Sequence, residues 1–453
     1  MEIFELSREQ LIEKLTELIS KRKNSAIKKI IDGFHYADVA EIINELDHDQ
    51  AIYLIKLIDS DKTSDILTEL DEDVREKILN TLSLKEIAGE IKEMDTDDAV
   101  DILDELTDER KEKVISLIKD EDLTENIREL LNYDEDSAGG LMAKELISVY
   151  ENWSVEKCLR EIRRQAKNIT RVHSIYVTNR KNELIGRLSL KDLITSPSKS
   201  KISNIYIPKV DFVYVNDPGE EVAKVMSKYD LEAIPVVDDE KKLLGRITID
   251  DIVDFIKEEA EEDYLLAAGI SNDVEADDSI FELTKARLPW LILGLFGGLG
   301  SVFILESYEG IMSKPSLRAL FFYTPLIAAM AGNVGVQSSA IVVQGLANDV
   351  IKGSIISRLF KEVSLTLLNG IILSIIVILF GLAINQPMDM SLTISASMIC
   401  VIIVAALIGT SVPIILNRFG IDPAIATGPF ITTGNDIIGI ILFFYIAKVI
   451  LVF

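Results

Sequence analysis

Residues 427–453 read TGPFITTGNDIIGIILFFYIAKVILVF, and this apolar C-terminal stretch contains a single acidic residue, Asp436. A charged side chain at such a depth costs at least ~2.5–3.5 kcal/mol on membrane-insertion scales, which makes Asp436 a candidate functional residue. A lone carboxylate among neutral oxygens is typical of a site for a hard cation such as Mg2+ or Ca2+. Its neighbours include helix-weakening residues and oxygen donors, namely Gly428, Pro429, Gly434, Thr432, Thr433 and Asn435.

The stretch is the last of five apolar segments, each of which reaches or approaches the ~20 residues that cross a bilayer. The segments are 286–306, 318–347, 361–384, 391–417 and 424–452. Glycine and proline interrupt the second and fifth segments, which predicts broken or tilted helices. Positive residues of the short loops favour a cytoplasmic N-terminus, since Lys352, Arg358, Lys361 and Arg418 would then lie inside, with Lys314 and Arg318 as exceptions.

The charge of the chain is divided sharply between its two parts. The 453 residues include 74 acidic and 47 basic ones, a net charge of −27. From Leu291 onward seven Lys/Arg balance seven Asp/Glu, so the whole negative charge lies in the first 290 residues. This balance argues against nucleic acid as a partner and suits cation binding, although a solvated acidic surface explains it equally well. The two cysteines, Cys158 and Cys400, are too far apart in sequence to suggest a disulfide framework or a thiolate metal site.

Residues 1–136 contain an internal repeat of 24 residues. The units DVAEIINELD, KTSDILTELD and EIAGEIKEMD begin at positions 38, 62 and 86, and DAVDILDELT at 98–107 repeats the theme. Each of the three units has Ile or Leu at helical spacing and an Asp at its end. Stacked short helices explain such a period, so we expect an all-α superhelical domain. The start of the chain, MEIFELSREQ, lacks the apolar core of a signal peptide, which predicts that this domain is cytoplasmic.

A second repeat follows between residues 137 and 256. The stretches HSIYVTNRKNELIGRLSLKDLI at 173–194 and AIPVVDDEKKLLGRITIDDIV at 233–253 each read as strand, turn, strand and helix. The recurring GR-(L/I)-(S/T)-x-x-D core resembles a tandem pair of CBS (cystathionine-β-synthase) domains. Such domains often bind an adenine nucleotide such as ATP, for which Thr248 and Asp250 would be the natural contacts. Capping of the following helix is the alternative explanation for both residues.

The helix that leaves the second CBS-like repeat is strongly acidic. Its sequence, DDIVDFIKEEAEEDYLLAAG, has Lys257 as almost its only cation, and like charges four residues apart destabilise a helix. Bound divalent ions would relieve that repulsion, whereas a solvated helix face is the simpler explanation. In the second apolar segment, Asn333 and Gln337 are four residues apart and share a helix face. They would be unsatisfied against lipid but could bind the water around an ion in a pore, while the adjacent glycines are explained by helix packing.

These features together resemble the MgtE family of magnesium channels along essentially the whole chain. The motifs are A-G-N-x-G-x-Q at 331–337, T-T-G-N-D at 432–436, the tandem CBS repeats and the acidic helical N-terminal region. The resemblance implies a homodimer with five membrane helices per subunit and a pore on the two-fold axis. It assigns the pore carboxylate to Asp436, a backbone carbonyl ligand of the hydrated ion to Thr432, and a pore-lining amide to Asn333.

The same resemblance implies regulatory Mg2+ sites on the cytoplasmic side. The implied metal ligands are Asp97, Asp101, Glu220, Asp230, Asp251, Asp254, Glu259, Glu262 and Asp263. For the N-terminal domain, Asp98 and Asp104 are rivals to Asp97 and Asp101. Mg2+ at these acidic faces would stabilise a closed state, and their mutual repulsion at low Mg2+ would free the gate.

We therefore predict a multi-pass protein of the plasma (inner) membrane that transports Mg2+ and is not an enzyme. Its predicted parts are an acidic helical domain (1–136), two CBS domains (137–200 and 201–256), an acidic connecting helix (257–285) and a five-helix transmembrane domain (286–453). Asp436, Thr432, Asn333, Gln337 and Asn435 are the expected ion-path residues. Transport of another divalent cation (Co2+ or Mn2+), or a membrane-anchored sensor of Mg2+ or nucleotide without transport, are the alternatives that stay open.

Overall fold

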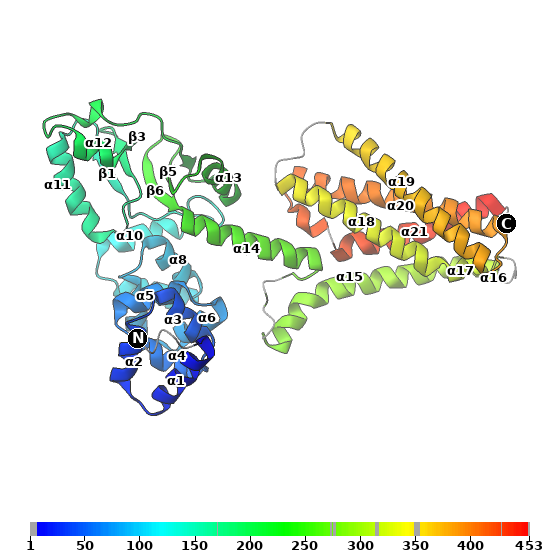
Figure 1. The fold of residues 1–453 in the computed structure, drawn as a ribbon, viewed down its shortest axis with the longest axis horizontal. Coiled ribbons are helices and arrows are strands. Elements are labelled where there is room, and N and C mark those ends of the chain that lie inside the picture. The colour runs from blue at the N-terminus through cyan, green and yellow to red at the C-terminus, as the bar shows by residue number, and fades with distance from the viewer. Residues whose placement is uncertain are drawn as a thin grey trace. The chain divides into compact units, whose positions relative to one another are not determined.

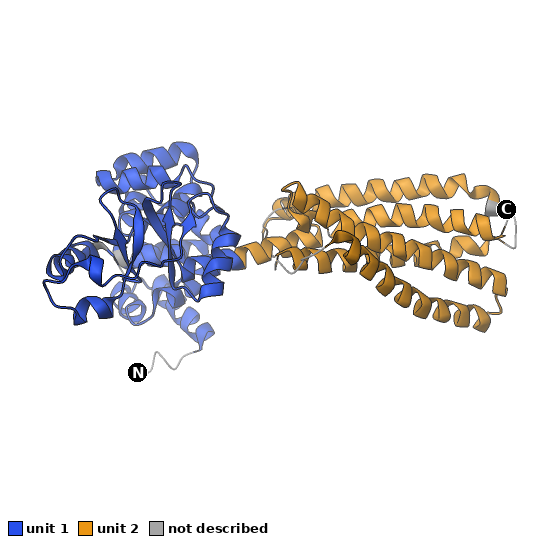
Figure 2. Ribbon diagram, turned by 90° about the horizontal axis from the view of Figure 1, so that it is seen from above, with its two compact units in different colours: residues 1–256 blue, residues 257–453 orange. Residues whose placement is uncertain are grey.

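The computed structural model describes residues 7–451 except 170, 272–273, 275–277, 313–316, 348–353 and 427. The described chain forms two compact units, residues 1–256 and residues 257–453 (Figure 2). Each unit is considered by itself below. Lys314 and Lys352, on which the predicted topology partly depends, lie outside the described residues, as does part of the predicted connecting helix (257–285).

Ten helices form the N-terminal part of the first unit, coloured blue to cyan in Figure 1. They are α1 (Arg8–Ser20), α2 (Asn24–Ile31), α3 (Tyr36–Asn44), α4 (His48–Ile55), α5 (Ser60–Thr68), α6 (Glu72–Thr81), α7 (Leu84–Ile91), α8 (Thr96–Asp104), α9 (Asp108–Leu117) and α10 (Glu121–Leu130). Helices two apart in sequence pack together, for example α3 on α5 and α5 on α7. The predicted stacking of short helices is therefore confirmed.

The 24-residue period has a local cause at the helix starts. Helices α3, α5 and α7 begin 24 residues apart, at Tyr36, Ser60 and Leu84. The aspartate that ends each of the three regular repeat units is the N-cap residue of the next helix: Asp47 for α4, Asp71 for α6 and Asp95 for α8. Aspartate suits this position because a negative charge is favourable near the positive end of the helix dipole. None of these three side chains bonds to its own helix, so each carboxylate is available to other groups.

Two three-stranded sheets complete the first unit, and their strand order confirms the predicted pair of CBS-like repeats. The first repeat consists of β1 (Ile147–Tyr150), α11 (Val155–Gln165), β2 (Ile175–Thr178), β3 (Leu184–Leu188) and α12 (Leu190–Thr195). The second consists of β4 (Val213–Tyr214), α13 (Gly219–Tyr229), β5 (Ala233–Val237), β6 (Leu243–Thr248) and α14 (Ile249–Ala268). In both sheets the first two strands are parallel and the last two antiparallel. The buried side chains of Tyr176, Leu184, Val237 and Leu243 form one cluster that joins the two repeats.

The second unit contains five helices that are long and apolar enough to cross a membrane, as predicted. They are α15 (Ile280–Ser307), α18 (Thr324–Ala347), α19 (Ile355–Ala383), α20 (Met388–Arg418) and α21 (Gly428–Leu451), with short helices α16 (Glu309–Met312) and α17 (Ala319–Phe322) between the first two. Helix α20 packs against α18, α19 and α21, and α15 packs against α21 (Figure 1). Many large apolar side chains on the outside of this bundle are exposed, as expected for a protein surface that faces the hydrocarbon of a bilayer.

Two helix boundaries differ from the sequence-based expectation for clear physical reasons. Helix α15 begins at Ile280 rather than near residue 286, because Ser279 and Glu282 form a capping box that starts the helix earlier. The second apolar segment is divided before Pro325, where α17 ends and α18 begins, and it is continuous through Gly332 and Gly335. Proline fits the first turn of a helix, where its missing N–H group has no partner to lose.

Candidate ion-path and cation-binding sites

Asp436 lies in the third turn of α21, roughly 12 Å along the helix axis from its start at the standard rise. Its carboxylate lies against the backbone of α18, because a side chain added at Gly332 would meet Asp436 Oδ1 at 3.3 Å and Thr432 Cγ2 at 3.5 Å. Within the described residues, Asp436 has no hydrogen-bond or ion-pair partner. A half-buried carboxylate without a counter-charge attracts a cation.

Asn333 and Gln337 lie on the same helix face, as the sequence predicted. Both side chains are exposed in the single chain, whereas the neighbours Gly332, Gly335 and Ser338 are buried against the bundle. A polar, uncovered face in the middle of a membrane helix needs water or protein opposite it, because lipid offers no hydrogen bonds. The two amides therefore mark a side of α18 that does not face lipid.

Thr432 and Asn435 occupy different positions from the exposed amides. The Thr432 hydroxyl donates to the backbone oxygens of Gly428 and Pro429, each at 3.1 Å, so the side chain is engaged within α21. Asn435 is only 1% exposed and faces Gly335 of α18. Its amide thus lies between two helices of the bundle, whereas the half-buried Asp436 carboxylate lies one residue further along the chain.

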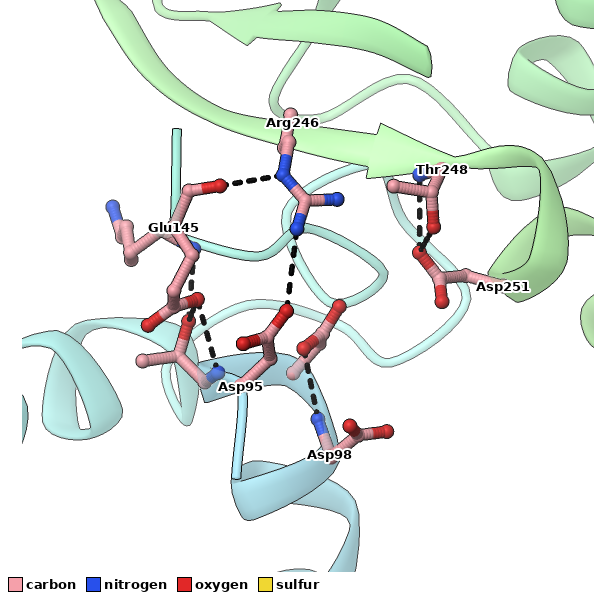
Figure 3. Close-up of polar contacts among 9 residues, drawn as sticks. Asp95, Asp98, Glu145, Arg246, Thr248 and Asp251 are labelled. Atoms are coloured by element: carbon pink, nitrogen blue, oxygen red, sulfur yellow. Dashed lines mark hydrogen bonds and ion pairs between the residues drawn. The ribbon is translucent and has the colours of Figure 1, made fainter. Parts of the chain in front are cut away.

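A second acidic site lies in the first unit, where the helical repeats meet the CBS pair. One carboxylate oxygen each from Asp95, Asp97 and Glu145 lies within 4.8 Å of the other two, a spacing that could hold a metal ion. Asp98 and Asp251 are close enough to act on these groups electrostatically (Figure 3). The cluster combines the start of α8, the loop before β1 and the first turn of α14, so it exists only when the two parts of the unit are packed together.

Burial and mutual repulsion make these carboxylates hard to ionise. Burial, followed by the charge of Asp251, raises the pKa of Asp98 to about 8. Burial and the neighbouring Glu145 raise the pKa of Asp95 to about 6. The pKa of Asp97 is also raised well above its usual range, by burial and then by Asp98. A cation among them would favour the ionised forms, so this arrangement is suited to binding a divalent ion.

A positively charged side chain of the protein lies at the edge of the cluster. Arg246, which is 6% exposed, donates from Nη2 to Asp95 Oδ2 at 3.2 Å and from Nε to the backbone oxygen of Glu145 (Figure 3). Thr96 completes the joint, since its N–H and hydroxyl both donate to Glu145 Oε2, at 3.1 and 2.8 Å. These bonds tie the start of α8 to strand β6 without a metal ion.

Of the metal ligands that the resemblance implies, Asp97 belongs to this cluster, and Asp251 and Asp101 lie near Asp98, whereas three other participants were not predicted. Asp95, Glu145 and Arg246 were not among the candidates, and Asp98 was only a rival. Asp95 could have been found from the sequence, because it is the aspartate that ends the third repeat unit, a position that caps a helix. Glu145 lies in a loop and has no pattern that could have revealed it.

The remaining predicted acids lie on α13 and along α14. Glu220 and Asp230 are exposed at the two ends of α13, where Lys224 is 3.6 Å from Glu220 and Asp230 is the left-handed C-cap at φ 51°. Asp254, Glu259, Glu262 and Asp263 follow Asp251 on α14. Burial, followed by the charge of Asp254, raises the pKa of Glu69 at the end of α5, so Asp254 also lies near the helical repeats.

The two residues predicted to contact a nucleotide differ in burial and in bonding. Thr248 is 4% exposed, and both its N–H and its hydroxyl donate to Asp251 Oδ2, the arrangement of a helix cap. Asp250 is exposed. The capping interpretation therefore accounts for Thr248 in this structure.

The fold and these sites define a class of membrane protein. Its members have five spanning helices, a carboxylate inside one span and a pair of CBS domains. Family models match three parts of the chain, namely a divalent cation transporter domain at residues 324–446, an MgtE intracellular N domain at 34–136 and CBS domains at 138–199 and 202–258. The chain belongs to the MgtE family. It is accordingly a multi-pass membrane transporter with an intracellular N-terminal region and not an enzyme, which confirms both predictions.

Individual relatives agree with this assignment. The chain is 30% identical to the magnesium transporter MgtE of Bacillus subtilis (strain 168) over 97% of both chains. It is 35% identical to the magnesium transporter MgtE of Enterococcus faecalis (strain ATCC 700802 / V583), over 71% of this chain and 70% of that one. Among solved structures, the cytosolic domain of the Mg2+ channel MgtE in complex with ATP matches at 31% identity with a TM-score of 0.51, covering 54% of this chain and all of that one.

The raised pKa of Asp98 predicts a pH-dependent stability of metal-free α8. The folded state keeps a proton on Asp98 up to about pH 8, whereas the unfolded chain releases it near pH 4. The stability contributed by this group is therefore complete below about pH 4 and is lost as the pH rises to about 8. We expect Asp98→Asn to stabilise α8 in chelator by about 1–3 kcal/mol at pH 8 and much less at pH 5.

Hydrogen exchange of the α8 amides in wild type and variant at the same pH measures this difference. Asp104→Asn is the matched control, since Asp104 is an exposed aspartate of the same helix that pairs with Lys111. If Asp98→Asn increased the protection of the α8 amides over wild type equally at pH 5 and at pH 8, the result would contradict the prediction.

Proposed function

We propose that this protein transports Mg2+ across the plasma membrane as a homodimer, with the ion passing the Asp436 carboxylate. The observation that carries the proposal is the unpaired carboxylate of Asp436 against Gly332, on a span whose neighbour α18 presents exposed Asn333 and Gln337. The named activity of the relatives described above supports the same ion.

The chemistry of the site favours Mg2+ among cations. Mg2+ gives up its waters reluctantly and is usually held by one or two carboxylates through a partly hydrated shell. One Asp436 from each of two subunits would supply two carboxylates, and Asn333 and Gln337 would contact the waters. The backbone carbonyl of Thr432 is the further oxygen ligand in this scheme. Mn2+ and Co2+ are the rival ions, because Mn2+ in particular uses the same oxygen ligands.

A second copy of the chain explains the uncovered polar face. In a monomer, Asn333 and Gln337 would contact lipid and leave their amides unsatisfied, at a cost of several kcal/mol for each group. A two-fold axis beside this face would instead enclose a water-filled path between two identical surfaces. A sensor without transport has no use for such residues at this depth, so transport is the better explanation.

Neutralising Asp436 is the direct test of the ion path. We expect Asp436→Asn to reduce Mg2+ uptake into liposomes at least about 100-fold, because the carboxylate provides the charge that compensates partial dehydration of the ion. Uptake is followed with an enclosed Mg2+-sensitive dye. Asp389→Asn, which removes a carboxylate in the first turn of α20, is the control and should transport like wild type. Undiminished uptake by Asp436→Asn would refute the assignment, and uptake of Mn2+ or Co2+ but not Mg2+ by wild type would change the ion.

We further propose that cytosolic Mg2+ regulates this flux through the acidic groups of the first unit and α14. Mg2+ at Asp97, Asp101 and Asp251, joined by Asp95, Asp98 and Glu145, would replace repulsion by attraction and stabilise the packed arrangement. The other proposed ligands are Glu220, Asp230, Asp254, Glu259, Glu262 and Asp263. Mg2+ shifts the balance between closed and open states only by its difference in affinity for the two, and several weak sites together give a steep response.

The regulatory proposal predicts a separation of transport from inhibition. Neutralising Asp251, Glu259 and Asp263 together should leave uptake at low cytosolic-side Mg2+ intact and raise the inhibitory Mg2+ concentration about tenfold, equivalent to a loss of roughly 1.4 kcal/mol of differential binding. The measurement is uptake as a function of Mg2+ on the cytosolic side.

A control of equal charge change is available on α10, where Glu121, Asp122 and Glu125 are exposed. Neutralising these three should leave inhibition unchanged. Inhibition that is equally unaffected in the α14 variant would rule out the proposed regulation.

We infer that the CBS pair also binds an adenine nucleotide. The support is the 31% identity to a cytosolic domain whose structure was determined with ATP. In this chain the exposed Asp250 would face a ribose, and Thr248 would have to exchange its bond to Asp251 for one to the nucleotide.

A further inference from the structure

Consecutive residues of α21 face two glycines of α18 that are one helical turn apart. Asp436 lies against Gly332, as described above, and Asn435 lies against Gly335. A side chain at Gly335 would overlap Asn435 Nδ2 and would come within 2.8 Å of Ile431 Cγ2. The Asn435 amide therefore occupies the space that any other residue at position 335 would fill.

Helix α18 has no room to withdraw from this contact. On its other side, a side chain at Gly409 of α20 would collide with the backbone oxygen of Gly335. The α18 backbone is thus enclosed between α20 and the Asn435 side chain. Asn435 is 1% exposed, and neither of its amide atoms has a hydrogen-bond partner within the described residues.

No hydrogen bond to a described residue holds the Asn435 amide, so its fit against Gly335 is steric. Neighbouring residues of a helix point about 100° apart around its axis. A rotation of α21 that withdraws Asn435 from Gly335 would therefore also swing the carboxylate of Asp436 away from Gly332. The position of one side chain determines the position of the other.

We propose that Asn435 is a positioning residue: seated on Gly335, it fixes the rotation of α21 against α18 and so holds the Asp436 carboxylate in the ion path. This inference rests on the proposed function of Asp436. It gives Asn435 a role between helices, distinct from lining the path, and makes Gly335 its partner.

The test measures Mg2+ uptake by the full-length protein in liposomes over a range of external Mg2+ concentrations. Asn435→Ala removes the amide, and we expect the half-saturating Mg2+ concentration to rise about fivefold while the maximal rate per folded protein stays within about twofold. Asn435→Leu retains the branched shape of the side chain and should bring the half-saturating concentration below that of Asn435→Ala. Gly434→Ala is the matched control, because a side chain added there meets nothing within 4 Å.

The glycine partner allows an independent rescue experiment. Gly335→Ala alone should impair uptake or folding, because its methyl group overlaps the amide. The double variant Gly335→Ala with Asn435→Ala should recover part of the folded yield and lower the half-saturating concentration toward the wild-type value, since the methyl group then fills the vacated space and only its close contact with Ile431 Cγ2 persists. Non-additivity of this kind is expected only for residues in direct contact.

Several outcomes would overturn the proposal. An unchanged half-saturating concentration in Asn435→Ala, or a change in folded yield alone, would leave Asn435 a packing residue. A leucine variant as defective as the alanine variant would show that steric seating is not what positions the carboxylate. Failure of the proposed function gives a different result. If the ion does not pass Asp436, Asp436→Asn retains uptake, whatever the Asn435 variants show.

Discussion

The cost of keeping carboxylates away from water governs both sites of this molecule. In the membrane unit, a half-buried Asp436 faces glycine backbone and has no counter-charge among the described residues. In the first unit, burial raises the pKa of Asp98 to about 8 and that of Asp95 to about 6. Both arrangements are unfavourable without a cation and become favourable with one, which is the physical basis for a protein that moves a divalent ion and responds to it.

The two sites solve this problem in different ways. At Asp436 the surroundings are neutral, and the charge is left for a transient, hydrated ion. At the cluster near α8, Arg246 supplies one permanent positive charge to Asp95, and Thr96 binds Glu145. These contacts join the helical repeats to strand β6 without a metal ion, while Asp97, Asp98 and Asp251 lie close enough together to repel one another. The joint therefore combines a permanent ion pair with a group of mutually repelling carboxylates, among which a bound cation would relieve the repulsion.

Much of this architecture could be predicted from patterns along the chain. The 24-residue period predicted the stacked helices, and it reflects the N-cap positions of Asp47, Asp71 and Asp95 at every second helix, α4, α6 and α8. The length of the apolar segments predicted five spans, and the isolated charge made Asp436 a candidate that lies inside the fifth of them. The partners of these residues could not be predicted, since Glu145 lies 49 residues from Thr96 and Arg246 lies 151 residues from Asp95. The burial of Asn435 was equally hidden, because it depends on a glycine 100 residues earlier.

Within the second unit, the end of the acidic helix α14 meets the start of the helix that carries Asp436. A side chain at Gly428 would collide with the backbone oxygen of Ala267, and one at Gly269 would meet Pro429 Cδ at 2.8 Å. Both glycines have positive φ, 47° and 80°, a conformation that other residues adopt only with strain. The two chain segments thus contact each other through backbone rather than through long side chains, so they have little room to move relative to each other. Asp436 is eight residues from Gly428, a little over two turns of a continuous helix. These contacts therefore fix where the first turn of α21 begins, about two turns before the carboxylate that lies against Gly332 of α18.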